Sequence, residues 1–568
     1  MSDQIADRKA KLDKIRALGV EPYGGRFTGV TPNADIRVAA EKLGIAPGQI
    51  VETPEARFRA AGRIVLLRDI GSLIFMTVRD WTGELQLGLS KKMVRRVAEA
   101  VSRSAATDAP TDAATGAAAV ASAPCGRRDA PTDASTNVPT HAATKAPIDP
   151  ATDAPPDRPP SQGGPQGGDD TAWKLAKLLD LGDIVGAAGR LGRTQTGELT
   201  LWADAFTLLS KAVRPPPEKW HGLTDVEARY RRRYVDLAAN PESQRIFLLR
   251  ARIIDYIRGV LRQRGFIEVD TPVLQPIYGG AAARPFTTHH NTLDLDLYLR
   301  ISPELYLKRC LVGGLERVYE FARCFRNEGI SPRHNPEFTM LELYQAYGDY
   351  HDLMEITEEI IAGAARDVIG ALKIKFGARE IDYTPPWPRR RYADLFAEHV
   401  GLAIADVAAI RERAAELHGQ KRIALDPAKA DDAVVVNALF EHYVEPRLVN
   451  PTFVIDYPAP LCPLTKRVPG DPGRALRFEP YINGMEMGNA YSELNDPAVQ
   501  RETFTRQLRG EGDETMAVMD EDYCEALECG MPPAGGLGIG IDRLVMLLTG
   551  SPSIRDVLLF PLQRLQGG

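Results

Sequence analysis

Two kinds of hydrophobic pattern alternate along this chain and divide it into regions. Residues 1–20 carry apolar side chains at helical spacing between charged ones, which predicts an amphipathic helix. Residues 58–89 instead carry short β-branched and aromatic segments that are broken by glycine turns. The same pattern resumes after Trp173 and runs to residue 213. It predicts a meander of short strands that closes into one small β-barrel.

The pattern changes from residue 229 onward and predicts a second, larger region of mixed helices and strands. Residues 243–264 have the period of a long amphipathic helix, and residues 350–440 are largely helical in pattern. Residues 318–325 and 338–344 are predicted to form two strands joined by a long loop rich in Gly, Pro and Asn. The tail alternates strands with helices and ends in a glycine-rich strand that runs directly into a helix.

Between the two barrel segments the composition changes abruptly. Residues 101–170 contain no Leu, Met, Phe, Tyr or Trp, and they repeat phrases such as TDAPTDAAT and DPATDAPPD. Such a segment cannot bury enough apolar surface to offset the entropy of ordering it, so we expect it to be disordered. It would lie inside the barrel domain, as a tolerated loop expansion or as a docking tail. The loop expansion is the favoured interpretation.

Charge and composition exclude several classes of function. The 568 residues carry a net charge of −6, with 44% hydrophobic and 26% charged residues, which describes an ordinary soluble protein without a global nucleic-acid signature. No apolar run approaches the roughly 20 residues of a membrane span, and the charged N-terminus lacks a signal-peptide core. The six cysteines form no CxxC pair, which favours free thiols in a reducing cytoplasm over a zinc site.

The densest set of chemically useful side chains lies in residues 325–344. The planar fork of an arginine suits an anionic oxygen, a phenylalanine suits a flat base, and a carboxylate suits an amine or a metal ion. A buried, salt-bridged hairpin is the alternative, and it would be favoured for any one residue alone. Together, six suitable groups in one hairpin predict a binding site: Arg326, Glu328, His334, Phe338, Glu342 and Tyr344.

Two C-terminal segments carry groups that suit a polyphosphate and its metal ion. Glycines alternate along residues 535–540, and Arg543 follows at the start of a helix, where backbone N–H groups attract phosphate. Glu479 and Glu486 stand on either side of an Asn-Gly turn, so both carboxylates can face one magnesium ion. The alternatives are a packing strand for the glycines and a solvated strand edge for each acid.

A third set of residues predicts a pocket for a cation. Asn489, Tyr491 and Glu493 alternate at strand period and share one face. Glu304 begins a predicted helix, where it either complements the helix dipole or turns into a cleft beside Glu342 and Glu493. In the second arrangement the cleft is acidic, and crowded carboxylates favour a cationic ligand.

These segments resemble the signature motifs of class II aminoacyl-tRNA synthetases, in the blocks GFIEVDTPVLQPI, FRNEGISPRHNPEFTMLELY and GLGIGIDRLVML. Further blocks narrow the resemblance to the bacterial-type lysyl-tRNA synthetases: GGAAARPFTTHHNTLDLDLYLRISPELYLKR, RFEPYINGMEMGNAYSELNDP and HGLTDVEARYRRRYVDL. The resemblance covers nearly everything except residues 95–170. The motifs are long, ordered and many, so the match is highly specific.

The resemblance implies an α+β protein with an N-terminal five-stranded OB-fold β-barrel that binds the anticodon. A class II catalytic domain would follow, built on an antiparallel β-sheet flanked by helices. The implied regions are a helical extension, the barrel with its insertion, a linker, and the catalytic domain with a helical insertion. Their expected boundaries are residues 1–57, 58–215 (insertion about 98–170), 216–240 and 241–568 (insertion about 390–445).

The resemblance also assigns roles to single residues, with Arg326 and Arg543 as the catalytic residues. The residues implied to bind ATP are Arg326, Glu328, His334, Asn335, Phe338 and Arg543. The residues implied to bind lysine are Gly280, Glu304, Arg326, Glu342, Tyr344, Asn489, Tyr491 and Glu493. Glu479 and Glu486 are the implied magnesium ligands, and the residues implied to read the anticodon are Arg68, Phe75, Gln86 and Glu198.

The implied enzyme is a lysine–tRNA ligase of translation. The carboxylate of L-lysine would attack the α-phosphorus of ATP, release pyrophosphate, and leave an adenylate from which lysine passes to the 3′ end of tRNA(Lys). Loss of Glu493 would abolish lysine-dependent pyrophosphate exchange. About three Mg²⁺ ions per subunit would assist. A cytoplasmic homodimer without membrane contact is expected, with Pro272 and the helix before it at the interface.

Three alternatives remain open. An aspartate or asparagine synthetase shares the barrel and the motifs, but its pocket needs a cation, whereas the pocket here is predicted to be acidic. A ligase that lysylates elongation factor P lacks the barrel. A catalytically inactive paralogue has no need of Arg326, Arg543 and both magnesium ligands. The departures from the family pattern are Tyr491 for a common phenylalanine, Cys462 for a usual serine, and the insertion.

Overall fold

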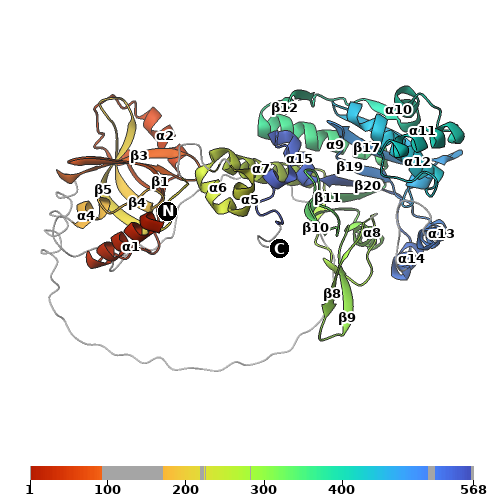
Figure 1. Cartoon of the computed structure of the whole chain (residues 1–568), viewed down its shortest axis with the longest axis horizontal. Helices are drawn as coiled ribbons and strands as arrows, with labels where there is room; N and C mark the ends of the chain where they lie inside the picture. Colours follow the sequence, from red (N-terminus) through yellow and green to blue (C-terminus); the bar gives the residue numbers. More distant parts are fainter. Residues whose placement is uncertain are drawn as a thin grey trace, which may run out of the picture. The chain divides into compact units, whose positions relative to one another are not determined.

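The computed structural model describes residues 2–92, 171–217, 223, 225–281, 283–509 and 519–563. The low-complexity insertion expected at about 98–170 lies outside the described residues, as does part of the expected linker. The chain divides into two compact units, Met1–Glu218 and Lys219–Gly568 (Figure 1). None of the described helices is long and apolar enough to cross a bilayer.

The first unit is built around a closed five-stranded barrel. Its strands are β1 (Arg57–Ile70), β2 (Leu73–Arg79), β3 (Glu84–Ser90), β4 (Ile184–Arg193) and β5 (Leu199–Ser210), and its helices are α1 (Ser2–Ala17), α2 (Asn33–Lys42) and α4 (Thr171–Ala176). Ile74, Met76 and Val78 alternate along β2 and are buried, as the two-residue period of a strand requires. Because β1 pairs with β4 and β3 pairs with β5, the strands on the two sides of the insertion complete one barrel, as predicted.

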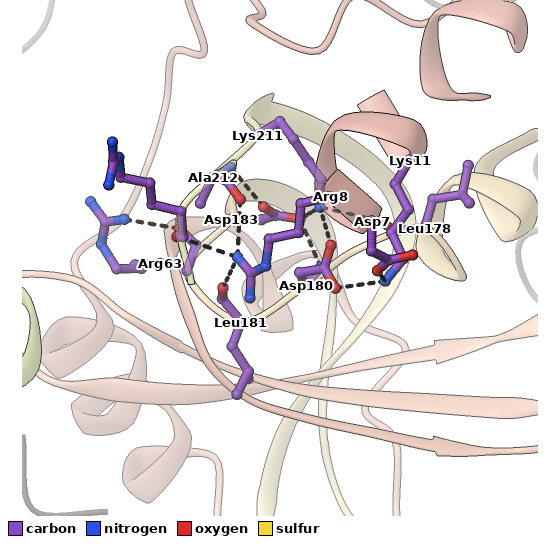
Figure 2. A network of polar contacts seen from close by, with 12 residues as sticks. Asp7, Arg8, Lys11, Arg63, Leu178, Asp180, Leu181, Asp183, Lys211 and Ala212 are labelled. Atoms are coloured by element: carbon purple, nitrogen blue, oxygen red, sulfur yellow. Dashed lines mark hydrogen bonds and ion pairs between the residues drawn. The ribbon is translucent and has the colours of Figure 1, made fainter. Parts of the chain in front are cut away.

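Helix α1 is fastened to the barrel by two basic side chains (Figure 2). Arg8 Nη1 donates to the backbone carbonyls of Leu181 and Ala212, each at 2.9 Å. Lys11 Nζ lies 2.8 Å from Asp180 Oδ1. The charged face of this helix is therefore used for docking against the chain between β4 and α4 and against the segment after β5.

Beneath α1 lies a closed network of buried charges (Figure 2). Lys211 Nζ donates to Leu178 O at 3.3 Å, to Asp180 Oδ2 at 2.6 Å and to Asp183 Oδ2 at 2.8 Å. The other oxygen of Asp183 accepts from the backbone N–H of Ala212 at 2.8 Å. The side chains of Lys211 and Asp183 are both 0% exposed. Every donor of this ammonium is thus matched within the chain.

The second unit is built on a ten-stranded sheet. Its strands are β6 (Ile267–Glu268), β10 (Arg317–Phe325), β11 (Glu337–Ala346), β14 (Arg389–Arg391), β15 (Thr452–Pro458), β16 (Arg467–Val468), β17 (Asp471–Ile482), β18 (Met485–Glu486), β19 (Gly488–Ser492) and β20 (Ala534–Gly540). The main order is β14-β15-β17-β19-β20-β11-β10-β6. The sheet is antiparallel from β15 to β10, as expected, and only the edge pairs β14–β15 and β6–β10 are parallel. Parallel neighbours need a long crossover, and helices separate both pairs along the chain.

Helices cover this sheet and extend it. They are α5 (Val226–Arg231), α6 (Arg233–Ala239), α7 (Pro241–Gln263), α8 (Glu304–Val312), α9 (Tyr350–Ala364), α10 (Tyr392–Val400), α11 (Val407–Gly419), α12 (Asp432–Tyr443), α13 (Pro497–Leu508), α14 (Glu521–Glu528), α15 (Ile541–Thr549) and α16 (Ile554–Val557). The apolar faces of α7, α9 and α15 form one hydrophobic core with the central strands. A second core joins α10, α11 and α12 to β15 and β17.

Two small sheets complete the second unit. They consist of β7 (Leu274–Gln275), β8 (Phe286–His290) and β9 (Leu295–Leu299), and of β12 (Lys373–Phe376) and β13 (Arg379–Asp382). The second sheet and β14 interrupt residues 350–440, which the pattern predicted to be largely helical. Ile381 is fully buried against the core of the sheet, and Gly377 turns the chain with a φ of 60°. A short hairpin of this kind is hidden inside a longer helical pattern because it spans only a few residues.

Candidate active site

The predicted hairpin between residues 318 and 344 forms two neighbouring strands of the sheet, β11 and β10, between β20 and the short edge strand β6. β10 and β11 pair antiparallel from Arg317↔Gln345 to Phe325↔Glu337, and residues 326–336 form the loop between them. β11 pairs on its other side with β20. The alternating side chains of β11 therefore share a face with the glycines of β20.

The glycines of β20 form a flat floor between two rows of side chains. The residues paired with Gly536 and Gly538 are Tyr344 and Glu342 on β11 and Tyr491 and Asn489 on β19. A Cβ atom on Gly536 would collide with the Tyr344 ring and the Glu493 carboxylate. The floor is therefore backbone and the walls are side chains, as the alternating glycines predicted.

A cavity of about 200 Å³ lies above this floor. It brings together seven of the eight residues predicted to bind lysine: Gly280, Glu304, Arg326, Glu342, Tyr344, Asn489 and Tyr491. Glu493, the eighth, is 0% exposed and does not line the cavity. Its backbone N–H donates to Ala534 O at 2.8 Å, which holds it beside the start of β20.

Glu342 is held in the acidic wall by two hydroxyl donors. Ser302 Oγ donates to its Oε1 at 2.9 Å, and the Tyr344 hydroxyl donates to its Oε2 at 2.9 Å. Burial, with the Glu304 carboxylate nearby, raises the pKa of Glu342 to about 7. Near neutral pH this carboxyl group is poised between its two forms, and a bound ammonium group would favour the ionised one.

Glu304 and Glu493 share a buried lysine that the sequence analysis did not single out. Lys308 Nζ lies 2.6 Å from Glu304 Oε1 and 2.5 Å from Glu493 Oε2. The Tyr491 hydroxyl also donates to Glu304 Oε1, at 2.6 Å. Burial raises the pKa of Glu493 to about 8, with Lys308 opposing the rise and Glu304 adding to it. The available signal was spacing, because Lys308 follows Glu304 by four residues and shares its helix face.

A second cavity, of about 190 Å³, adjoins the first. Its walls include all six residues predicted to bind ATP: Arg326, Glu328, His334, Asn335, Phe338 and Arg543. Arg326, Met340 and Asn489 line both cavities. The Arg326 guanidinium lies 5.1 Å from the centroid of the Phe338 ring. Arg326 Nε is buried and has no hydrogen-bond partner within the described ranges, so this donor remains available.

Arg543 closes the far side of the second cavity. Its Nη1 donates to Glu486 O at 2.7 Å, and its Nη2 lies 3.0 Å from His334 Nε2. Burial, together with the charge of Arg543, lowers the pKa of His334. The neutral ring accepts from Arg543 at Nε2 and donates from Nδ1 to Ser331 Oγ at 2.8 Å. Both terminal nitrogens of the Arg543 guanidinium are thus held by hydrogen-bond acceptors, which fixes its orientation.

The start of α15 is fixed by the residue before Arg543. Asp542 Oδ2 accepts from the backbone N–H of Thr339 at 2.7 Å, and its Oδ1 lies 2.6 Å from Arg250 Nη1. Asp542 thereby ties α15 to β11 and to α7. This tie fixes the first turn of α15, which carries Arg543, relative to the sheet.

Glu479 and Glu486 lie on the two arms of a tight hairpin. β17 and β18 pair Tyr481 with Glu486, and Asn483 and Gly484 turn the chain with φ values of 54° and 66°. This confirms the predicted hairpin. Burial, and repulsion from Glu479, raise the pKa of Glu486 to about 6.

The two carboxylates fit a magnesium ion that takes its other ligands from water and phosphate. Glu479 Oε1 accepts from Arg477 Nη2 at 2.5 Å, and Oε2 accepts from the hydroxyls of Tyr457 and Tyr481 at 2.6 and 2.8 Å. Glu486 has fewer partners: its Oε2 lies 3.9 Å from Arg543 Nη1, and the positive charges of Arg543, Arg477 and Arg326 only partly offset the rise of its pKa. Within the described residues, no cluster of three or more His, Cys, Asp or Glu side chains has metal-binding geometry. Glu479 and Glu486 could share such an ion with a bound phosphate.

The four residues predicted to read an anticodon lie on the first unit. One row across its strands consists of Arg68, Phe75, Gly88 and Trp202, on β1, β2, β3 and β5. The Phe75 and Trp202 rings meet edge to face with centroids 5.7 Å apart, and the Trp202 ring lies against Gly88. Gln86 pairs in the next row, and Glu198 is exposed just before β5. The sequence analysis did not single out Trp202. The signal for it was an aromatic residue within the alternating pattern of a barrel strand.

Comparisons with known proteins agree with this geometry. The family model described as tRNA synthetases class II (D, K and N) matches residues 225–564. A lysine–tRNA ligase of Carboxydothermus hydrogenoformans is 44% identical over 99% of this chain and 98% of its own length. Those of Pelotomaculum thermopropionicum and Moorella thermoacetica are 45% and 43% identical, each over 99% of this chain and over 95% and 98% of their own lengths.

The second unit is therefore the catalytic domain of a class II aminoacyl-tRNA synthetase. Within that class, the chain belongs to the lysine–tRNA ligase family.

Proposed function

We propose that this protein ligates L-lysine to tRNA(Lys) in two steps, with ATP as the second substrate. The observation that carries the proposal is the junction of the two cavities at Arg326, with an acidic wall on one side and an arginine and an aromatic ring on the other. An acidic pocket suits a dibasic amino acid and opposes the aspartate that related synthetases take.

Lysine occupies the acidic cavity in this proposal. Its two ammonium groups are taken by the carboxylates of Glu304 and Glu342, with Tyr344, Asn489 and Tyr491 as the side walls, and the buried Glu493 adds its negative charge from behind the wall. Gly280, whose φ of 82° requires a residue without a side chain, lets the loop approach Glu304 closely. The lysine carboxylate then points toward Arg326.

ATP occupies the second cavity, with adenine on the Phe338 ring and the phosphates between Arg326 and Arg543. Glu328, His334 and Asn335 hold the nucleotide from the loop. Asn335 is anchored for this role because its Nδ2 donates to Glu337 O at 2.6 Å.

Glu479 and Glu486 are proposed to hold Mg²⁺, which when bound would neutralise charge on the phosphates. The residues of the chain do the remaining work. A lysine carboxylate oxygen forms a bond to the α-phosphorus, and the bond from that phosphorus to the bridging oxygen of pyrophosphate breaks. Arg326 and Arg543 stabilise the charge that this displacement spreads over the phosphate oxygens. The terminal ribose hydroxyl of tRNA then bonds to the lysyl carbonyl carbon, and AMP leaves.

The barrel is proposed to be an OB-fold that binds the anticodon of tRNA(Lys). Phe75 and Trp202 offer aromatic faces to unstacked bases, which single-stranded RNA recognition requires. Arg68, Gln86 and Glu198 surround them with groups that can hydrogen-bond base edges.

A cytoplasmic homodimer is proposed as the working form. Ile267, Leu274 and Leu293 are 53%, 48% and 67% exposed around Pro272 and the β8–β9 hairpin, and a second copy would cover them. The cysteines of the described residues are free, which suits a reducing compartment.

Amino-acid-dependent exchange of pyrophosphate into ATP tests the proposal. We expect L-lysine to support exchange at least about 100-fold better than L-aspartate or L-asparagine, because the pocket offers carboxylates and not a cation to the substrate side chain. Transfer of radioactive lysine to a tRNA(Lys) transcript is the second readout. Exchange driven equally well by aspartate would reject the proposal.

A further inference from the structure

Three carboxylates and one ammonium group are built into the acidic cavity and its surroundings. Glu304, Glu342 and Glu493 are 5%, 4% and 0% exposed, and Lys308 is 0% exposed. With all four groups ionised, three negative charges and one positive charge leave a formal charge of −2. Lysine brings two ammonium groups, and its carboxylate faces Arg326.

We propose that Lys308 is a positioning residue for lysine recognition. It is the permanent counter-cation that holds the carboxylates of Glu304 and Glu493 in place and matches the acidity of the pocket to the two ammonium groups of the substrate. This inference rests on the function proposed above. Lys308 acts through the two acids, because it does not line the cavity.

The position of Lys308 explains why it serves the pocket and is not a surface cation. Its ammonium group bridges Glu304, on its own helix α8, to Glu493, which follows β19. It also lies 5.4 Å from the centroid of the Tyr491 ring. One side chain therefore links the two acids from different elements and sets the distance between them.

The charged and titratable groups around this ammonium come from five neighbouring segments. They are Glu304 and Arg309 on α8, Glu342 and Tyr344 on β11, Tyr491 on β19, Glu493 after it, and Tyr523 on α14. Burial alone would lower the pKa of Lys308, but the carboxylates of Glu304 and Glu493 raise it well above its ordinary value. Lys308 therefore stays charged throughout the range in which the enzyme can be assayed.

Replacement of Lys308 by methionine keeps the length of the side chain and removes the charge. The acids would then keep an extra proton, since crowded carboxylates without a cation cannot all ionise. In the full-length protein we expect the KM for lysine at pH 7.5 to rise about 10-fold or more, and the ascending limb of log kcat/KM for lysine to move up by about one pH unit. The KM for ATP should stay within about twofold.

Two further variants separate charge from packing. Lys308→Arg keeps the positive charge and should leave the pH limb within about 0.3 unit of the wild type. Lys211→Met removes an equally buried lysine from the barrel unit, and it should destabilise the protein without moving the limb. A Lys308→Met enzyme with an unchanged limb, or with equal rises in KM for lysine and ATP, would overturn the inference. Lysine-independent behaviour of the wild type would instead reject the proposed function itself.

Measurements of thermal stability separate a charge role of Lys308 from a packing role even if the Lys308→Met protein is too unstable for kinetic assays. Carboxyl groups whose pKa is raised by folding bind protons more tightly in the folded state, so their contribution to stability falls as pH rises from the unfolded to the folded pKa. Removal of the Lys308 charge should raise the folded-state pKa values of these carboxyl groups further. The difference in Tm between wild type and Lys308→Met should therefore widen from pH 6 to pH 9. A constant difference would show a packing defect and contradict the charge role.

Discussion

Each unit of this protein contains a buried lysine between two carboxylates, and the two clusters differ in how completely they are satisfied. Lys211 in the barrel unit donates to three acceptors, and both oxygens of Asp183 accept hydrogen bonds. Lys308 in the catalytic unit contacts Glu304 and Glu493 at similar distances. Glu493 Oε2 is occupied by Lys308, whereas Glu493 Oε1 is buried and has no hydrogen-bond partner in the described part of the chain.

The difference teaches that burial and charge alone do not distinguish a structural cluster from a binding site. A closed network stabilises one arrangement and has no capacity left for a ligand. An open network retains acceptors in a low-dielectric place, where an added ammonium group is bound strongly. Burial raises the pKa of a carboxyl group in both units, of Asp183 in the barrel unit and of Glu342 (to about 7) and Glu493 (to about 8) in the catalytic unit, so it is the free acceptor and not the raised pKa that distinguishes the two clusters.

The largest expected effect comes from breaking the open cluster at Glu493. Glu493→Gln removes one negative charge and keeps the shape, so we expect kcat/KM for lysine to fall about 10³-fold or more, equivalent to about 4 kcal/mol of transition-state stabilisation. Pyrophosphate exchange with saturating ATP measures it. The Tm should not fall by more than about 2 °C, because crowding of carboxylates is relieved. A variant that keeps near-normal exchange would remove Glu493 from lysine recognition.

The matched change in the closed cluster is Asp183→Asn, and its effect should fall on stability instead. The substitution leaves Lys211 with less compensation in a buried site, so the free energy of unfolding of the barrel unit should drop by about 3 kcal/mol. Urea denaturation followed by tryptophan fluorescence measures the loss. Lysine-dependent exchange by the folded protein should stay within about twofold of wild type. A loss of exchange comparable to that of Glu493→Gln would erase the contrast between the clusters.

The smallest expected effect is the pH dependence of the unaltered enzyme. The folded pKa values of Glu342 and Glu493, about 7 and about 8, lie above the ordinary glutamate value, so both groups hold protons at pH 6. Ammonium binding favours their ionised forms, so the KM for lysine should fall about 10-fold between pH 6 and pH 8.5 and then level off. Initial rates across this range, with ATP saturating, provide the measurement. A KM that rises with pH would contradict the assignment of these acids.

The parts of the site that depend on local periods could be predicted from the sequence. The strands of residues 317–346, the alternating glycines of β20 and the hairpin at Asn483-Gly484 all follow from two-residue spacing and turn residues. The continuity of the barrel across the insertion was also predictable, because the strand pattern stopped and resumed in the same form.

Features that depend on distant packing could not be predicted in the same way. Lys308 lies in an ordinary amphipathic helix, where a lysine is usually solvated, but its ammonium group is buried beside Tyr491 on β19, Glu493 after it and Tyr523 on α14. The parallel pairing of β6 with β10 depends on the path of the chain through α8. Trp202 gains its meaning only when β5 is placed beside β3.

Arg326 lines both cavities, and this has a thermodynamic consequence for the two substrates. In the proposed arrangement, a guanidinium ordered by the phosphates is already placed for the lysine carboxylate, and the reverse is equally true. The free energy by which bound ATP alters lysine affinity must equal the free energy by which bound lysine alters ATP affinity. One side chain thereby makes the two binding equilibria interdependent, so the saturation of either site depends on the concentration of the other substrate.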